Sequence, residues 1–231
     1  MPTLVISGAN RGLGLELTRQ YLEDGWRVHA ACRRPEQAQE LGALAQRHRE
    51  RLTVHALDVT DHERVAELGR ALSGETLDLV FSNAGVLLDR GESALEVRAE
   101  TLARSFEINA TGAFLFGRAF LEGLARSERP VLAAMTSRMG SIGDNTSGGY
   151  YAYRASKAAL NMLWRTLAHE LRPRGICCVL LHPGWVRTRM GSKAAPLEPA
   201  ESARGLRAVL ARLTLQDTGR FFSYDGTELP W

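Results

Sequence analysis

Short apolar runs alternate with longer stretches of mixed polarity along the whole chain. The runs are rich in β-branched residues and are apolar almost throughout rather than at every second position. This pattern is typical of strands that are buried on both faces of a parallel sheet. Seven such runs predict strands, over residues 3–7, 26–32, 52–57, 77–82, 131–137, 176–182 and 220–224.

The stretches between these runs predict helices, over residues 13–24, 36–49, 62–72, 94–125, 152–171 and 200–213. Gly25 suits the end of the first helix, Pro35 suits the start of the second, and Asp61 is a candidate N-cap for the third. Repeated strand–helix–strand units require right-handed crossovers. The sequence therefore predicts an α/β fold, a doubly wound parallel sheet of about seven strands flanked by helices on both faces, in a single domain over residues 1–231.

The composition is that of an ordinary globular chain, with 45% hydrophobic and 24% charged residues among 231. The net charge of +3 is scattered rather than clustered, so no nucleic-acid partner is expected. No apolar stretch reaches the roughly 18 residues of a membrane span, and the N-terminus predicts no signal peptide. The dispersed histidines show no metal-ligand spacing, so no metal site is predicted.

The three cysteines, Cys32, Cys177 and Cys178, form no CxxC pair. A disulfide scaffold or a structural zinc site is therefore not predicted. We expect a reducing compartment instead, and so a cytoplasmic protein.

A glycine-rich segment connects the first predicted strand to the first predicted helix. It reads Ser-Gly-Ala-Asn-Arg-Gly-Leu-Gly and places glycines at 8, 12 and 14. Glycines here allow a tight turn and a close backbone approach to a diphosphate, which the amides at the helix N-terminus would bind. The position between strand and helix favours a dinucleotide-binding loop over an ordinary turn.

Two arginines, Arg33 and Arg34, follow the second predicted strand, where an acidic residue would bind the ribose 2′-hydroxyl of NAD. No such carboxylate is present. Arginine suits the 2′-phosphate of NADP, and Arg11 in the glycine-rich loop is a second candidate for that group. The alternative is a pair of solvated loop arginines, but the missing carboxylate favours NADP(H) over NAD(H).

Polar and small residues follow the other strands. Asp58, the Asn83-Ala84-Gly85 run, Ser137 and the Pro183-Gly184 pair each come at or just after the end of one. Each alone is equally explained as a turn. Because the carboxyl ends of parallel strands meet at one edge of a sheet, all of them are expected along the crevice where ligands bind.

Tyr153 and Lys157 lie four residues apart in a predicted helix, and hence on one face of it. An ammonium beside a phenol favours the phenolate, which would suit the tyrosine to proton transfer near neutral pH. A Tyr-x-x-x-Lys pair alone is more often a solvated helix face. Because this sequence also places polar and small residues at the strand ends, where ligands bind, we interpret Tyr153 and Lys157 as a candidate catalytic pair.

Taken together, these motifs resemble the short-chain dehydrogenase/reductase family in its compact, Rossmann-type single-domain form. Within it, the glycine-rich segment, the run Tyr-Ala-Tyr-Arg-Ala-Ser-Lys at 151–157 and the ending Asp-Gly-Thr-Glu-Leu-Pro-Trp look like the C-factor and sniffer-type carbonyl reductases. Ser7 and Ser82 depart from the threonine and asparagine that are common in the family.

The resemblance implies a catalytic tetrad of Asn109, Ser137, Tyr153 and Lys157. Tyr153 would be the acid/base, Lys157 its partner, Ser137 a donor to the substrate oxygen and Asn109 a holder of a relay water. Cofactor contacts are implied at the strand ends and the loops that follow them, by Gly8, Asn10, Arg11, Gly12, Leu13, Gly14, Arg33, Asp58, Val59, Asn83, Ala84, Gly85, Tyr153, Lys157, Pro183, Gly184, Val186 and Thr188.

The implied activity is reversible hydride transfer between NADP(H) and a small carbonyl or alcohol. The alternative is a protein that senses NADP(H) on the same fold without turnover. Loops at 140–149 and 188–199 are candidate substrate loops. Four large side chains lie on or beside them and either line an apolar pocket or serve only in structural packing: Trp185, Met190, Ile142 and Tyr150. A homodimer or homotetramer is the assembly that the resemblance suggests.

Overall fold

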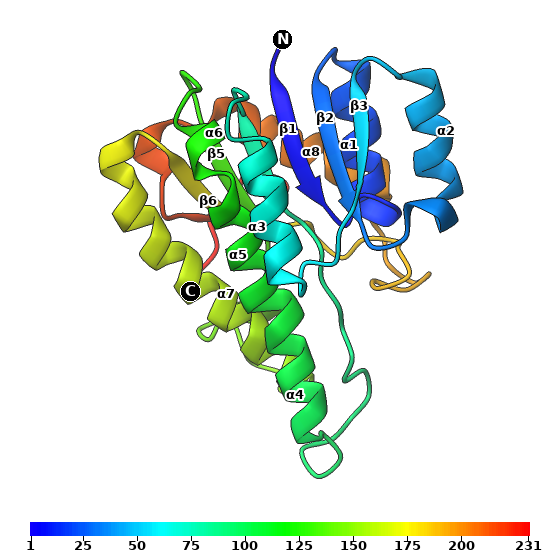
Figure 1. Ribbon diagram of the computed structural model, residues 1–231. Coiled ribbons are helices and arrows are strands. Elements are labelled where there is room, and N and C mark those ends of the chain that lie inside the picture. Colours follow the sequence, from blue (N-terminus) through cyan, green and yellow to red (C-terminus); the bar gives the residue numbers. More distant parts are fainter.

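The computed structural model describes residues 1–231, and seven parallel strands form one sheet (Figure 1). The strands lie in the order β3-β2-β1-β4-β5-β6-β7. Their bounds are Thr3–Ser7 for β1, Arg27–Cys32 for β2, Leu52–Ala56 for β3, Leu79–Ser82 for β4, Val131–Met135 for β5, Cys177–His182 for β6 and Phe221–Ser223 for β7. The predicted fold class, a doubly wound parallel sheet of about seven strands, is confirmed.

The strand order reverses beside β1. The first three strands run outward from β1 to the edge at β3, and the chain then crosses back to place β4 on the other side of β1. In open α/β sheets, ligands bind at the carboxyl ends of the strands where this reversal occurs. The crevice is therefore expected between the loops that follow β1 and β4.

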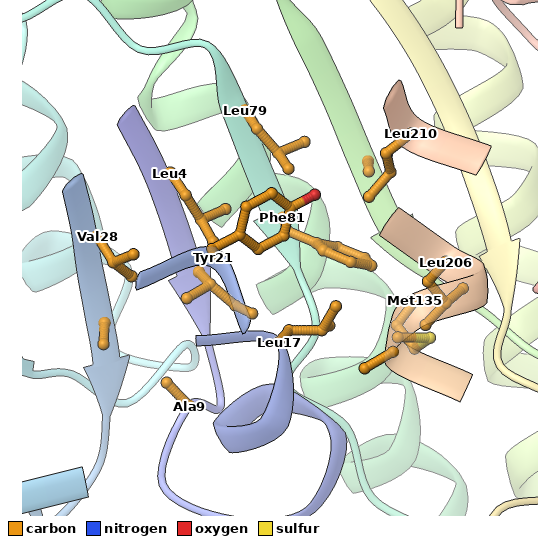
Figure 2. Close-up of a cluster of buried hydrophobic side chains, with 14 of the residues drawn as sticks. Leu4, Ala9, Leu17, Tyr21, Val28, Leu79, Phe81, Met135, Leu206 and Leu210 are labelled. Atoms are coloured by element: carbon orange, nitrogen blue, oxygen red, sulfur yellow. The ribbon is translucent and has the colours of Figure 1, made fainter. Parts of the chain in front are cut away.

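Helices cover both faces of the sheet. On one face, α1 (Gly12–Glu23), α2 (Gln39–Arg47) and α8 (Pro199–Arg212) pack on side chains such as Leu4 and Phe81. Figure 2 shows part of this layer, in which Leu17 of α1 and Leu206 of α8 lie over the strands. On the other face lie α3 (His62–Ala71), α5 (Ala113–Ala119) and α7 (Tyr151–Leu171). Burial of strands on both faces explains their continuous apolar runs.

The predicted helix over 94–125 is wrong in two respects. It begins at Ala99, because the Glu96 carboxylate accepts the Ser93 amide at 2.8 Å and a local turn takes the place of the first helical turn. It is also interrupted. α4 (Ala99–Phe106) passes into a π-helical segment (Glu107–Gly112) before α5, and the short α6 (Leu121–Leu124) follows a break at Phe120.

Smaller differences occur at other boundaries. The predicted helix over 36–49 is divided by Ala38 into a 3₁₀ turn (Pro35–Gln37) and α2. β5 ends at Met135 rather than at 137: the Thr136 amide still bonds the Leu181 carbonyl of β6, but Ser137 turns out of the sheet to cap the 3₁₀ turn that follows. No helix combines the length and the apolar character needed to cross a membrane.

Candidate functional site

The glycine-rich loop after β1 is folded tightly against the loop after β4. Gly8 and Gly12 have positive φ values of 68° and 55°, which side chains disfavour. A Cβ at Gly14 would lie only 2.2 Å from the Gly8 carbonyl oxygen. Arg11, at the N-cap position of α1, makes no side-chain cap bond. The first amides of α1 are thus left for an anion at the mouth of the loop.

Ser7 and Asn83 tie the two loops together. The Ser7 hydroxyl accepts the amides of Asn83 and Ala84 at 3.0 and 3.1 Å. The Asn83 side chain donates to the carbonyls of Ser7 and Gly8 at 2.9 and 3.3 Å. Ser7 therefore makes these bonds without the methyl group of a threonine. The hydroxyl of Ser82 likewise anchors β4, by donating to the Ala113 carbonyl at 2.8 Å.

The end of β2 and the end of β3 present opposite charges. Arg33 and Arg34 are exposed after β2. Burial alone would raise the pKa of Asp58, but bonds from Thr60 and the charges of Arg33 and Arg104 hold it below its usual value. The Asp58 carboxylate accepts the Thr60 amide at 3.0 Å and its hydroxyl at 2.9 Å. One Asp58 oxygen therefore stabilises a local turn, which is the alternative to ligand binding that the sequence left open for this residue.

Tyr153 and Lys157 lie in the first half of α7 and face inward, where they are only 7% and 3% exposed. This rules out the solvated helix face that the sequence left open. The Lys157 Nζ lies 5.9 Å from the centre of the Tyr153 ring and donates to the Met135 carbonyl at 2.8 Å. A Cβ on Gly85 would come 3.5 Å from that Nζ, so the loop after β4 lies directly against the pair.

Burial dominates the ionisation of this pair. It raises the pKa of Tyr153 to about 12, an effect that the Ser137 hydroxyl opposes and the charge of Asp89 strengthens. Burial also lowers the pKa of Lys157 to about 8. The lowering of the phenol's pKa that the helical spacing predicts is therefore not found in the protein alone, because Lys157 is bonded to the strand rather than to the phenol.

Ser137 and Asn109 approach the pair from two other elements. Ser137 follows β5, is 7% exposed, and caps the 3₁₀ turn Arg138–Gly140 by accepting the Met139 amide at 3.1 Å. Asn109 sits in the π-helical segment and bonds the backbone of Val86 in both directions at 2.8 Å. It also donates to Ser156 at 3.0 Å, whose hydroxyl donates to the Tyr153 carbonyl.

The loop after β6 covers the glycine-rich loop. A Cβ on Gly12 would lie 3.5 Å from the Thr188 methyl group, so the two loops lie against each other here. Val186 is buried at 4% exposure and bridges Leu197, and Gly184 has a φ of 81°. Of the remaining predicted cofactor contacts, Val59 is buried, while Asn10, Leu13 and Pro183 are partly exposed at the strand and loop ends.

The apolar candidates divide into two groups. Trp185 and Met190 lie on the loop after β6 and are 57% and 38% exposed. Ile142 lies elsewhere, in a cavity of about 210 Å³ shared with Met162 and Trp231 on the outer side of α7. Sequence reasoning missed Asp89, whose buried carboxylate contacts the start of α7. Only a long-range contact singles it out, so no local pattern would have found it.

Known proteins share this arrangement. A family model described as short chain dehydrogenase matches residues 2–198. The C-signal of Myxococcus xanthus is 46% identical over 160 residues, covering 67% of this chain and 93% of that protein.

Two solved structures cover the whole of this chain and are covered by it in full. The carbonyl reductase Sniffer of D. melanogaster has 34% identity and a TM-score of 0.95. A carbonyl reductase from Pseudomonas aeruginosa PAO1 in complex with NADP has 37% identity and a TM-score of 0.89. These likenesses confirm the predicted resemblance to C-factor and sniffer-type proteins, and the chain belongs to the short-chain dehydrogenase family.

Proposed function

We propose that the protein is an NADP(H)-dependent oxidoreductase that transfers hydride between the nicotinamide and a carbonyl or alcohol group of a small molecule. The observation that carries this proposal is the burial of Tyr153 and Lys157, at 7% and 3% exposure, against the loop after β4 that packs on the glycine-rich loop. Buried ionisable side chains with shifted pKa values in a cleft are typical of catalytic sites.

The residues at the crevice fit a dinucleotide phosphate. The uncapped amides at the start of α1 suit the diphosphate, and Gly14 leaves no room for a side chain between that helix and the Gly8 carbonyl. Arg33 and Arg34 are exposed where NAD-binding proteins place a carboxylate, and Arg11 in the glycine-rich loop is exposed as well. The complex of the Pseudomonas carbonyl reductase with NADP supports the same preference here.

The mechanism follows from the positions of three side chains. When bound, NADPH supplies the hydride. Negative charge then grows on the substrate oxygen, where the hydroxyls of Ser137 and Tyr153 are proposed to donate hydrogen bonds. Since the pKa of Tyr153 is about 12, its phenol is protonated at neutral pH and is ready to give its proton to that oxygen. We propose that the Lys157 ammonium, whose Nζ lies 5.9 Å from the ring centre, offsets part of the cost that burial imposes on the phenolate that remains.

A small aldehyde or ketone without strong charge is the substrate class that we infer. Trp185 and Met190 offer exposed apolar surface on the loop that carries Thr188, which is the proposed substrate loop over 188–199. The roles of all the named site residues are part of this proposal, as is the extent of the single domain over residues 1–231.

The test is a panel of aldehydes and ketones with the purified protein, following oxidation of NADPH and of NADH separately. Turnover with NADPH, faster than with NADH at equal concentration, is the expected result. Tight binding of NADPH without turnover of any carbonyl would favour the alternative, a non-catalytic sensor. The dehydrogenase and reductase names of the relatives favour the enzyme.

A homodimer or homotetramer is also part of the proposal. Met162 on α7 and Ile142 in the loop before it are 67% and 80% exposed and line one cavity with Trp231, an apolar surface that a second copy of the chain would cover. Light scattering during size exclusion would give a multiple of 25.4 kDa. A monomer mass across a wide concentration range would contradict assembly.

The three free cysteines are the basis for proposing a cytoplasmic location. Cys32, Cys177 and Cys178 are all buried and free, and burial raises the pKa of each thiol. Free thiols are common in a reducing compartment. Cell fractionation would test the location, and recovery of the protein outside the cytoplasmic fraction would contradict it.

A further inference from the structure

Asp89 is the one acidic residue whose side chain is buried, with 1% exposure. It lies in the segment that connects β4 to α4. One carboxylate oxygen, Oδ2, accepts the amide of Ala152 at 2.7 Å and the amide of Tyr153 at 3.4 Å. The other oxygen, Oδ1, is buried without a hydrogen-bond partner. A native protein rarely keeps a buried acceptor unpaired without a reason.

The helix that Asp89 contacts lacks a cap of its own. Tyr150, at the N-cap position of α7, has a left-handed backbone with a φ of 52° and makes no side-chain cap bond. Gly148 and Gly149 precede it with positive φ values. The first amides of a helix have no partner within the helix. Asp89, which is 63 residues earlier in the chain than Ala152, supplies that partner.

The segment that carries Asp89 is held from its other side as well. Arg90, the next residue, donates to the carbonyl of Met190 on the loop after β6. Val86, three residues before Asp89, is bonded in both directions by the Asn109 side chain. Asp89 is therefore placed by contacts on both sides rather than by its own bonds alone.

We propose that Asp89 is a positioning residue for Tyr153: it holds the first turn of α7 from outside the helix and so fixes where the phenol lies relative to Lys157 and Ser137. This inference rests on the proposed function of Tyr153 as the proton donor. An anion at a helix N-terminus is also favoured by the helix dipole, which explains why a carboxylate is tolerated here.

The charge of Asp89 has a consequence that a neutral cap would not have. Three side chains lie around Tyr153: Lys157 on the same helix, with its Nζ 5.9 Å from the ring centre, Ser137 after β5, and Asp89, which accepts the backbone amide of Tyr153. Burial raises the pKa of Tyr153 most, and the negative charge of Asp89 raises it further. An asparagine would accept the same amides without this charge. Asp89 therefore adds to burial in favouring the protonated phenol, which is the form that donates a proton.

Two variants separate position from charge. Asp89→Ala removes the cap, and we expect kcat to fall about tenfold or more while the affinity for NADPH stays within about twofold. Asp89→Asn keeps an oxygen for the two amides, so we expect it to regain most of that kcat. It should also lower the pKa of Tyr153, so the pH profile of alcohol oxidation should move to lower pH by about half a unit or more.

Glu96→Gln is the matched control, since Glu96 lies in the same segment and caps only the local turn at Ser93. It should leave kcat and the pH profile unchanged. Wild-type activity in Asp89→Ala, or an unshifted profile in Asp89→Asn, would overturn the proposal. If Asp89→Ala does not fold, the Asp89→Asn profile decides alone.

A readout without turnover distinguishes this inference from the proposed function. NMR of isotope-labelled tyrosine rings reports the ionisation of Tyr153 directly, with Tyr153→Phe to assign its signal. A lower midpoint in Asp89→Asn than in the wild type supports the inference even if no substrate is found. Equal midpoints overturn it even if the wild-type protein is active.

Discussion

Lys157 and Tyr153 are one helical turn apart, yet the Lys157 ammonium contacts the Met135 carbonyl and not the phenol. In the protein alone, loss of solvent therefore governs both groups. It raises the pKa of Tyr153 to about 12 and lowers the pKa of Lys157 to about 8. The same sequence spacing on an exposed helix would leave both side chains in water. At this scale, the burial of a group decides its chemistry more than its neighbour in the sequence does.

Tyr153→Phe tests the proton donor. The change removes one hydroxyl and keeps the ring, so the fold and the affinity for NADPH should be retained. Turnover should fall by about 10²–10⁴-fold, the usual contribution of a positioned acid. Steady-state kinetics and a fluorescence titration with NADPH give the two quantities. Near-normal turnover in the variant would remove Tyr153 from the mechanism.

Arg33→Ala tests the recognition of the 2′-phosphate. A charge-assisted bond to phosphate is worth about 1.5–3 kcal/mol, so affinity for NADPH should fall by about 10–100-fold. Affinity for NADH should change little, because NADH lacks that phosphate. Arg126, which precedes β5 and donates to the Ser73 carbonyl at the opposite edge of the sheet, provides the control Arg126→Ala. Equal weakening of both cofactors would mean that Arg33 does not contact the phosphate.

Among the elements, the interrupted helix between β4 and β5 shows how packing overrides a helical pattern. Gly112 lies so close to the loop after β3 that a Cβ would come 2.8 Å from the Val59 carbonyl oxygen. The π-helical segment that ends at Gly112 turns Asn109 toward Val86 and Ser156. π-helical turns inside α-helices are frequent at functional sites. This one places Asn109 beside α7.

Gly14→Ala tests the fit between α1 and the glycine-rich loop. The added Cβ would lie 2.2 Å from the Gly8 carbonyl oxygen and 2.5 Å from the Asn83 side-chain nitrogen. Such overpacking typically costs about 1–3 kcal/mol of unfolding free energy, and displacement of the loop should also weaken NADPH binding. Urea denaturation and a binding titration measure the two effects.

Gly42→Ala is the matched control for that variant. Gly42 lies within α2, and no atom lies within 4 Å of the place that a Cβ would take there. Alanine is favoured over glycine inside a helix, so the variant should be more stable by about 0.5–1 kcal/mol. A stable, fully binding Gly14→Ala protein would contradict the close packing of α1.

For the whole molecule, three buried or half-buried histidines link stability to pH. His29 and His55 stack between β2 and β3, with the His29 Nδ1 3.1 Å from the His55 Nε2, and Glu75 lies 3.2 Å from the His29 Nε2. Burial lowers the pKa of His29, and it lowers the pKa values of His55 and His182 to about 4.

These histidines take up protons in the unfolded chain before they do so in the folded protein. As pH falls below the usual value of 6.5, the unfolded state gains protons first, so stability decreases until pH approaches 4. The slope is up to about 1.4 kcal/mol per pH unit for each such histidine. Thermal unfolding between those pH values should show a smaller decrease for His55→Gln. His62→Gln, on the surface of α3, should behave as the wild type does.

Much of the fold and part of the site could be predicted from local pattern. Continuous apolar runs predicted the seven strands because both faces of the sheet are covered. Residues such as Asp58, Asn83 and Ser137 were predicted at one edge because parallel strands end together. The boundary errors at Ala99 and Met135 arose where side-chain bonds compete with the backbone pattern.

The sequence by itself determined the succession of strands and helices along the chain, the absence of an acidic residue after β2 and the spacing of Tyr153 and Lys157. These depend on neighbours in the chain, so local physics suffices to recognise them. Tertiary structure alone decided that the pair is buried, that Lys157 contacts Met135, and that Asp89 caps α7. Such contacts join residues far apart in the chain, and no local pattern encodes the solvent exclusion that sets their charges.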